Sequence, residues 1–412
     1  MRIGIDDTDS PAGMCTTYLG AVLIRRLMQM GMTLEEARVI RLNPNVTWKT
    51  RGNAAVCLEV RGDPEIAFHT ACQLVEELAD FSCENTNPGV VVVNQPMPPG
   101  FYLQAVQDFC EIDEAVNLLD RCNASYRGYK NGRGLIGATA AVCSELPDRT
   151  YELLAYRSPE RWGTVREVET ESLFAAEMNT FPHTWDSVDS ESGTVVCVPH
   201  TPDPVLFGIR GESPEWVSVA RSRVESEETA LEQVFVTNQG TDVHLIEHPS
   251  GSLKEGCSYL SRGVVHAGPE TGRGGHVSVV IEDISGHLLR CMAYEPTKGF
   301  RQRVRSLAPG DEVTVAGSFK RGSINLEKLC IRALASPVLT KPPLCPSCGK
   351  RMTSAGLHKG YKCRTCSTRM KDPETSIPPR PLSCGWYEVP PCARRHLARP
   401  LCRGNPDNVP TS

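Results

Sequence analysis

The chain has 412 residues, of which 40% are hydrophobic and 23% charged, and its formal net charge at pH 7 is −5. No apolar run approaches the about 20 residues that a membrane-spanning helix needs, so the composition excludes an integral membrane protein and predicts a globular protein of roughly three or four domains. Because Met1 and Arg2 lead directly into a predicted strand, we expect no signal peptide and a cytoplasmic location, and the sequence indicates no obligate protein partner. The 18 cysteines are spread along the chain, which fits reduced thiols with a few metal ligands.

The first 17 residues carry the most distinctive pattern. An apolar strand predicted over 2–5 runs into three carboxylates, Asp6, Asp7 and Asp9. Carboxylates this close repel one another unless a cation lies among them, and hard oxygen ligands suit Mg²⁺. A helix predicted over 16–31 places Thr16 at its N-terminus, where free N–H groups attract phosphate. Both a nucleotide–metal site and an ordinary capped helix explain this pattern.

Residues 1–122 alternate strand and helix in the order βαββαβ, followed by two short helices, and this order predicts a ferredoxin-like α/β unit. A second ferredoxin-like unit is predicted over 123–242. The expected strands are 2–5, 37–42, 54–60, 89–93, 152–156, 205–209 and 234–236, and the expected helices are 16–31, one after Pro64, 101–110, 112–121, 134–145 and one opening at Ser213-Pro214-Glu215.

A glycine-rich segment, Gly132 to Gly137, matches the G-x-G-x-x-G pattern and opens a predicted helix. The residues before it are polar and basic, whereas a dinucleotide site needs a hydrophobic strand there. We therefore predict a loop in which Lys130, Arg133 and Gly134 contact phosphate or substrate. The alternative is a plain glycine-rich helix entry.

A second basic turn precedes the strand predicted over 54–60. Within it, Arg51 and Asn53 are candidate phosphate contacts, and a solvated hairpin turn is the alternative. A Walker A motif and the protein-kinase signatures are absent from the sequence. A site for ATP would therefore be of an unusual kind.

Short strands separated by turns follow over 256–336, and five strands at this spacing predict an OB-fold barrel. The expected strands are 263–265, 276–281, 288–294, 312–319 and 331–334. Cations such as Arg301 and Arg303 lie near Tyr294 and Phe300, a combination that binds single-stranded nucleic acid. A solvated basic face is the alternative.

Two CxxC pairs within 341–371 predict a zinc ribbon. Cys345, Cys348, Cys363 and Cys366 can fill a Zn²⁺ tetrahedron, which makes the metal structural, and a disulfide pair is the alternative. The remaining residues, 372–412, form a basic C-terminal tail. From residue 336 to the end there are 13 Lys and Arg against 4 Asp and Glu, so we expect this end to meet a polyanion.

Several long motifs together resemble one family. GIDDTDS and GMCTTYL within 4–19, TRGNAAV at 50–56, GRGLIGATAAV at 132–142, PVLFGIRGE at 204–212, FVTNQGTD at 235–242 and WYEVPPCARRHLARPL at 386–401 resemble archaeal tRNA(Ile) 2-agmatinylcytidine synthetases, the TiaS family. The resemblance covers nearly the whole chain. It implies a Thr/Cys-kinase-like domain, a ferredoxin-like domain, an OB-fold and a zinc ribbon, in that order.

The resemblance implies an ATP-dependent ligase that joins agmatine to C2 of the wobble cytidine in a tRNA(Ile) with a CAU anticodon, so that the anticodon reads AUA rather than AUG. Asp6, Asp7 and Asp9 would hold Mg²⁺ on ATP, and Thr16 matches the family's autophosphorylated threonine. Arg51, Asn53, Lys130, Arg133 and Gly134 are the candidate phosphate contacts. The neighbourhoods of Asp186 and Asp242 are candidates for the agmatine pocket.

Two other functions account for part of the sequence. A nucleic-acid-binding protein without ATP chemistry would explain the barrel and the ribbon but not the acidic loop. A metal-dependent nuclease would use the aspartates and would cleave RNA without ATP.

Overall fold

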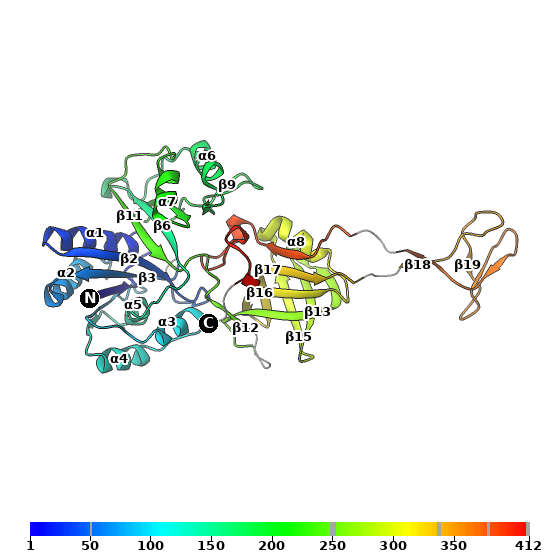
Figure 1. Ribbon diagram of the computed structural model, residues 1–412, viewed down its shortest axis with the longest axis horizontal. Coiled ribbons are helices and arrows are strands. Elements are labelled where there is room, and N and C mark those ends of the chain that lie inside the picture. The colour runs from blue at the N-terminus through cyan, green and yellow to red at the C-terminus, as the bar shows by residue number, and fades with distance from the viewer. Residues whose placement is uncertain (50–51, 248–252, 336–338, 377–379, 409–412) are drawn as a thin grey trace.

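The computed structural model describes residues 1–49, 52–247, 253–335, 339–376 and 380–408. The chain is arranged along one long axis, with a large sheet and its helices at one end, a barrel in the middle and a small ribbon at the far end (Figure 1). Among the described residues, no helix is both long and apolar enough to span a membrane.

Nine strands from both predicted α/β units form one continuous sheet in the order β5-β4-β1-β3-β2-β11-β6-β10-β7. The two halves join where β2 and β11 run parallel, with Arg38 opposite Val236. The strands are β1 (Arg2–Asp6), β2 (Thr33–Arg41), β3 (Ala54–Arg61), β4 (Gly89–Val93), β5 (Ser125–Gly128), β6 (Thr150–Tyr156), β7 (Thr184–Trp185), β10 (Val205–Gly211) and β11 (Leu231–Thr237). A separate short ladder pairs β8 (Val188–Asp189) with β9 (Thr194–Val195).

Helices cover both faces of this sheet. On one face, α1 and α2 bury their apolar residues in a core that also contains Tyr156 and Phe235, and on the other face α3, α4 and α5 form a second core. The helices are α1 (Thr16–Gln29), α2 (Pro64–Leu78), α3 (Gly100–Gln107), α4 (Ile112–Arg121), α5 (Gly134–Val142), α6 (Thr170–Thr180) and α7 (Pro214–Arg221). The predicted start of α7 is confirmed, since Ser213 Oγ accepts a hydrogen bond from Trp216 N at 3.3 Å.

Helix α5 packs closely on β1 and β4, which are strands of the first predicted unit. A Cβ atom at Gly4 would lie 2.2 Å from the Ala138 carbonyl oxygen, and one at Gly134 would lie 2.3 Å from Gly89 N. Only glycine allows this approach. The sequence places α5 at the start of the second predicted unit, but its contacts are with the strands that carry the acidic loop.

A five-stranded barrel follows the large sheet. Its strands pair in the order β13-β14-β15-β17-β16, and a further pairing of β16 with β13 closes the ring. They are β13 (Ser258–Thr271), β14 (Val277–Asp283), β15 (Leu288–Ala293), β16 (Glu312–Lys320) and β17 (Ser323–Ala333), with β12 (Leu245–Glu247) and β23 (Gly385–Glu388) added at the sides. The last strand predicted in the barrel, 331–334, is the end of the longer β17. Helix α8 (Lys298–Arg305) lies between β15 and β16 and was not predicted.

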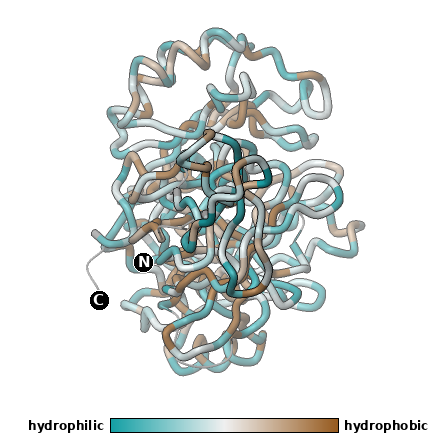
Figure 2. The backbone as a smooth tube through the Cα atoms, turned by 90° about the vertical axis from the view of Figure 1, so that its right-hand side faces the viewer, coloured by the Kyte–Doolittle hydropathy of each residue, from teal (hydrophilic) through white to brown (hydrophobic). Residues whose placement is uncertain are grey.

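The ribbon extends from the barrel on a two-stranded ladder in which Lys341 is opposite Glu374. Viewed from this end, the ribbon lies nearest the viewer, and its loops are mainly hydrophilic or neutral (Figure 2). The ladder is formed by β18 (Leu339–Lys341) and β22 (Glu374–Ser376), and the ribbon itself contains β19 (Thr353–Ser354), β20 (Tyr361–Lys362) and β21 (Arg369–Met370).

After the ribbon the chain returns to the body of the protein. β23 pairs with β17, and the segment 389–404 then lies against the large sheet. Arg403 Nε lies 2.6 Å from Glu212 Oε1, Arg394 forms an ion pair with Asp186, and Arg399 pairs with Asp148. The expectation that the basic end as a whole faces a polyanion is therefore wrong for these arginines, because they neutralise carboxylates inside the protein.

Candidate active site

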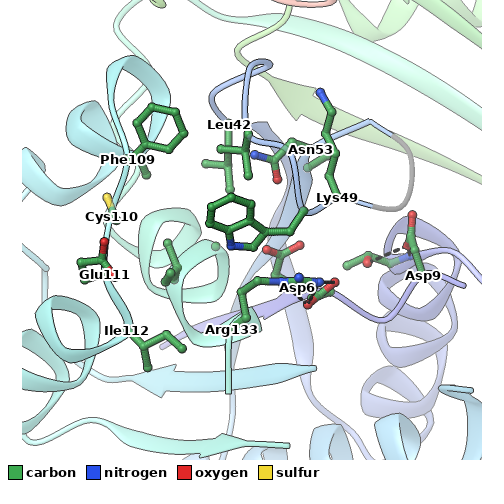
Figure 3. Close-up of a pocket in the computed structure, with 18 of the residues that line it drawn as sticks. Asp6, Asp9, Leu42, Lys49, Asn53, Phe109, Cys110, Glu111, Ile112 and Arg133 are labelled. Atoms are coloured by element: carbon green, nitrogen blue, oxygen red, sulfur yellow. Dashed lines mark hydrogen bonds and ion pairs between the residues drawn. The ribbon is translucent and has the colours of Figure 1, made fainter. Parts of the chain in front are cut away.

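Three aspartates, Asp6 at the end of β1 and Asp7 and Asp9 just after it, line one cavity of about 390 Å³, together with Thr16 and Arg133. Figure 3 shows Asp6, Asp9 and Arg133 at one end of this cavity, with Phe109 to Ile112 on one side and Lys49 and Asn53 on the other. The structure thus brings the acidic loop, the start of α1 and Arg133 of the glycine-rich loop together.

The carboxylate of Asp6 is held against α5. A Cβ atom at Gly137 would lie 1.9 Å from Asp6 Oδ2, so a glycine at this position leaves the space that the carboxylate fills. Two glycines of the G-x-G-x-x-G pattern therefore serve packing: Gly134 lets α5 approach β4, and Gly137 makes room for Asp6.

Burial and mutual repulsion disfavour the charged form of two of these carboxyl groups, Asp6 and Asp7. Burial, helped by the charges of Asp7 and Asp9, raises the pKa of Asp6 well above its usual value. Burial also raises the pKa of Asp7 to about 6, although Arg133 opposes the shift. A cation bound among the three carboxylates would stabilise their ionised forms. Carboxylate oxygens are the hard donors that Mg²⁺ prefers, but among the described residues only the four ribbon cysteines place three or more ligand atoms within 4.8 Å of one another, so the three aspartates would have to converge to share one ion.

Thr16 is the first residue of α1, and its side chain is almost fully buried. Asp9 Oδ1 accepts two hydrogen bonds from it, from the backbone N at 2.7 Å and from Oγ1 at 2.9 Å. Thr8 Oγ1 donates to Thr16 Oγ1 at 3.0 Å. The neighbouring Thr17 hydroxyl contacts Cys15 Sγ instead. The structure therefore distinguishes the two threonines, because Thr16 alone is held by the acidic loop.

The predicted phosphate contacts separate into two groups. Arg133 lies in the cavity and binds Asp7, and Asn53 lines the same cavity. Lys130 and Gly134 do not line it: Lys130 Nζ donates to the Glu84 carbonyl oxygen at 3.2 Å, and Gly134 faces β4. Arg51 lies outside the described residues.

A second cavity of about 280 Å³ lies beside the first. Thr16, Asp9, Gly52 and Ala54 line both cavities, so Thr16 stands at their junction. The second cavity is also lined by residues that the sequence did not single out, among them the charged Arg41, Glu152, Asp203 and Arg210 and the imidazole of His396.

The four cysteines of the ribbon meet as predicted. The Sγ atoms of Cys345, Cys348, Cys363 and Cys366 all lie within 4.8 Å of one another. Four thiolates at this spacing fit a tetrahedral Zn²⁺ and leave no open position on the metal. The site is therefore structural rather than catalytic.

Comparisons with known proteins place the chain in a family. Three family models match: the TiaS TCKD domain over 2–65, the TiaS FLD domain over 132–244 and the TiaS C-terminal zinc ribbon domain over 342–382. A protein of Methanocorpusculum labreanum named as a tRNA(Ile) 2-agmatinylcytidine synthetase, TiaS, is 53% identical over 99% of this chain and 98% of its own length. The chain belongs to the TiaS family.

Solved TiaS structures have the same fold. The TiaS chain in a complex with its isoleucine tRNA and ATP is 43% identical in sequence to this chain and superposes on it with a TM-score of 0.93. The match covers 98% of this chain and 97% of that one. A complex of TiaS with the same tRNA, AMPCPP and agmatine is 41% identical with a TM-score of 0.90 over the same shares of the two chains. The resemblance drawn from the sequence motifs is confirmed.

Two carboxylates that the TiaS resemblance suggested for agmatine lie in neither cavity. Asp242 forms a buried ion pair with Lys328 of β17, and Asp186 pairs with Arg394. Both join the C-terminal part of the chain to the large sheet.

Sequence reasoning also missed most residues of the second cavity. His396 lies within one of the TiaS motifs, but nothing local indicates that it lines the same cavity as Thr16. In the first cavity, Trp48 is 61% exposed within the basic turn. An aromatic residue in such a turn was the one local signal that could have been followed.

Proposed function

We propose that this chain is an ATP-dependent ligase that joins agmatine to C2 of the wobble cytidine of tRNA(Ile) with a CAU anticodon. Its curated relatives carry the name of this activity, and a related structure contains an isoleucine tRNA, an ATP analogue and agmatine. The observation in this chain that carries the proposal is the position of Thr16, between an acidic cavity suited to a metal–nucleotide complex and a second cavity on its other side.

The first cavity would hold the triphosphate of ATP. Asp6, Asp7 and Asp9 would bind Mg²⁺, which when bound supplies charge neutralisation for phosphoryl transfer. Arg133 keeps Asp7 in place through three hydrogen bonds and lies at the same end of the cavity, where it can also attract phosphate oxygens.

Thr16 would be the residue that is phosphorylated. Asp9 orients its hydroxyl at 2.9 Å and is placed to accept the proton when Oγ1 forms a bond to phosphorus. The backbone N–H groups at the start of α1 favour negative charge at this position.

The second cavity is the candidate site for agmatine and the target base. Agmatine is a dication, and the cavity is lined by the carboxylates of Asp9, Glu152 and Asp203. A base oxygen is a poor leaving group, so phosphorylation at the C2 oxygen of cytidine would allow the agmatine amine to displace phosphate. The wobble base has to leave its stack to reach this site.

The barrel and the ribbon would bind the rest of the tRNA. The order of pairing around the closed barrel is typical of an OB-fold, and Arg303 and Arg305 lie on the adjacent helix α8. We further infer that the half of the sheet built on β1 is kinase-like and that the half containing β6 and β10 is ferredoxin-like.

The test is incubation of the full chain with ATP, Mg²⁺, agmatine and unmodified tRNA(Ile) with a CAU anticodon, followed by nucleoside mass spectrometry. We expect agmatinylated cytidine only when ATP and agmatine are both present. Cleavage of the tRNA without ATP would instead support a nuclease, and tight binding with no ATP turnover would support a binding protein.

A further inference from the structure

The second cavity contains two arginines and a histidine next to Thr16. Arg41 ends β2, Arg210 lies on β10, and His396 belongs to the C-terminal segment that returns from the ribbon. These residues come from three distant parts of the chain. Their side chains line the second cavity, which shares Thr16 with the cavity of the three aspartates.

The guanidinium group of Arg41 is incompletely satisfied. Its Nη2 atom lies 3.6 Å from Glu152 Oε2, and its buried Nε has no hydrogen-bond partner among the described residues. Glu152 is shared, because Gln239 Nε2 donates to Oε2 at 2.6 Å and Arg210 Nε lies 3.4 Å from Oε1. A guanidinium group with a buried N–H that has no partner is a site where an anion can bind.

His396 presents a further donor. Arg210 Nη2 lies 2.6 Å from His396 Nδ1, and because arginine can only donate, Nδ1 must accept. Burial together with the charges of Arg41 and Arg210 holds the pKa of His396 well below its usual value, so the ring is neutral. The ring proton therefore resides on Nε2.

Gly52, which has no side chain, lies next to the Arg41 and His396 donors. A Cβ atom at Gly52 would lie 2.8 Å from Arg41 Nη1 and 3.7 Å from His396 Nε2. Gly52 lines both cavities, as Thr16 does. No side chain at position 52 covers the Arg41 and His396 donors.

We propose that Arg41, Arg210 and His396 form a subsite for a phosphoryl group beside Thr16, completed by the C-terminal segment. This proposal rests on the proposed function, in which Thr16 is phosphorylated and phosphate leaves from the activated cytidine. Arg41 and His396 Nε2 supply donors to the phosphoryl oxygens, and Arg210 is held in position by His396.

The probe is inorganic phosphate, titrated into the full chain by isothermal calorimetry with EDTA present, so that binding through a metal at the aspartates is excluded. We expect Arg41→Gln and His396→Leu each to raise the Kd for phosphate by about tenfold or more, since hydrogen bonds to charged groups are strong. Arg210→Lys keeps the charge but loses the planar fork, and it should weaken binding as well. Arg332→Gln, which removes an arginine paired with Asp407 on the barrel, is the matched control and should leave Kd unchanged.

A second titration uses the chain phosphorylated on Thr16. If the subsite holds the phosphoryl group of Thr16, free phosphate no longer binds; if it receives the phosphate released from the nucleoside, free phosphate still binds. Either result is consistent with the subsite and shows where the phosphoryl group that it binds comes from. Equal Kd values in the wild type, Arg41→Gln and Arg210→Lys, with all three folded by circular dichroism, would overturn it. That outcome is independent of nucleoside modification, which tests the proposed function separately.

Discussion

Arg133 donates two hydrogen bonds to the same oxygen of Asp7, with Nε at 3.0 Å and Nη2 at 2.8 Å from Oδ2. The pair joins the loop before α5 to the loop after β1, which are 126 residues apart. Arg133 also donates to the Asn85 carbonyl oxygen at 2.7 Å, so one guanidinium ties three segments together at the edge of the cavity. The Arg133 side chain therefore links Asp7 of the acidic loop to two other segments of the chain.

Replacing Asp7 by asparagine keeps the size of the side chain and removes its charge. We expect Asp7→Asn to lower ATP-dependent agmatinylation by about 10²–10³-fold, the scale seen when one charge-stabilising group is lost from an active site. Binding of tRNA should change little, because a carboxylate has no direct attraction for a polyanion. Asp63→Asn is the matched control, since Asp63 caps α2 and asparagine is an equally good cap. Full activity of Asp7→Asn at ordinary Mg²⁺ would exclude a role for Asp7 in metal binding.

Gly137→Ala tests whether the position of Asp6 matters. Alanine favours a helix over glycine by about 1 kcal/mol, but here its Cβ would lie 1.9 Å from Asp6 Oδ2 and would push the carboxylate away. We expect strongly reduced modification in a chain that still folds. Gly100→Ala, at a helix position with nothing within 4 Å of the added atom, should keep full activity. Both are measured by nucleoside mass spectrometry and thermal unfolding, and equal activities would show that the Asp6 carboxylate can move freely.

Local patterns predicted the local parts of this protein well. The strand–Asp–Thr16 sequence and the CxxC spacing concern residues that are close in the chain, so the grouping of the aspartates with Thr16 and the ribbon could be foreseen in outline. The single nine-stranded sheet could not, because the parallel pairing of β2 with β11 joins segments about 200 residues apart. The role of Gly137 depends on how closely α5 approaches β1, and the place of His396 depends on the return of the chain from the ribbon. Neither of these two features produces a periodic pattern in the sequence.

Phosphorylation of Thr16 is expected on incubation with ATP and Mg²⁺. Asp9 holds its hydroxyl, whereas Thr17 contacts Cys15. Phosphopeptide mapping should find the phosphate on Thr16, and Thr16→Val should abolish labelling from γ-labelled ATP, while Thr17→Val should not. Labelling of Thr17 alone would mean that the wrong threonine has been identified.

The ionisation of Glu327, on barrel strand β17, makes the stability of the folded state depend on pH. Burial alone would raise the pKa of this carboxyl group, but His244 and Arg395 outweigh it and hold the pKa at about 2, below its usual 4.5. The folded state therefore binds fewer protons than the unfolded state between these values. The stabilisation is fully present above pH 4.5 and is lost as the pH falls towards 2, and at about 1.4 kcal/mol per unit it amounts to about 3 kcal/mol.

Urea unfolding at several pH values measures this contribution. Between pH 4.5 and 2 we expect the wild type to lose about 3 kcal/mol more of its unfolding free energy than Glu327→Gln does. Glu76→Gln, which removes an exposed ion pair with Arg127, should follow the wild type. Parallel curves for the wild type and Glu327→Gln would show that Glu327 is not stabilised by its neighbours in the folded state.

The ribbon can be removed without disturbing the C-terminal segment. Truncation at residue 336 would also delete β23 and His396, so its effect on tRNA could not be assigned to the ribbon. Lys341 and Glu374 face each other in the β18–β22 ladder, and replacing 342–373 by an Asn-Gly turn closes that ladder as a hairpin. The deletion removes seven Lys and Arg residues, all exposed, and one Asp.

We expect this deletion to weaken tRNA binding and to leave ATP-dependent labelling of Thr16 intact. The slope of log K against log salt should become shallower by about 0.7–0.9 for each phosphate that the protein no longer neutralises. Cys363→Ser should have a partial effect of the same kind, because the buried apolar residues of the ribbon are few and its folding depends on zinc. The paired arginines of 394–403 remain in both variants, so an unchanged affinity and slope would mean that the ribbon does not bind tRNA and that its exposed cations serve another partner.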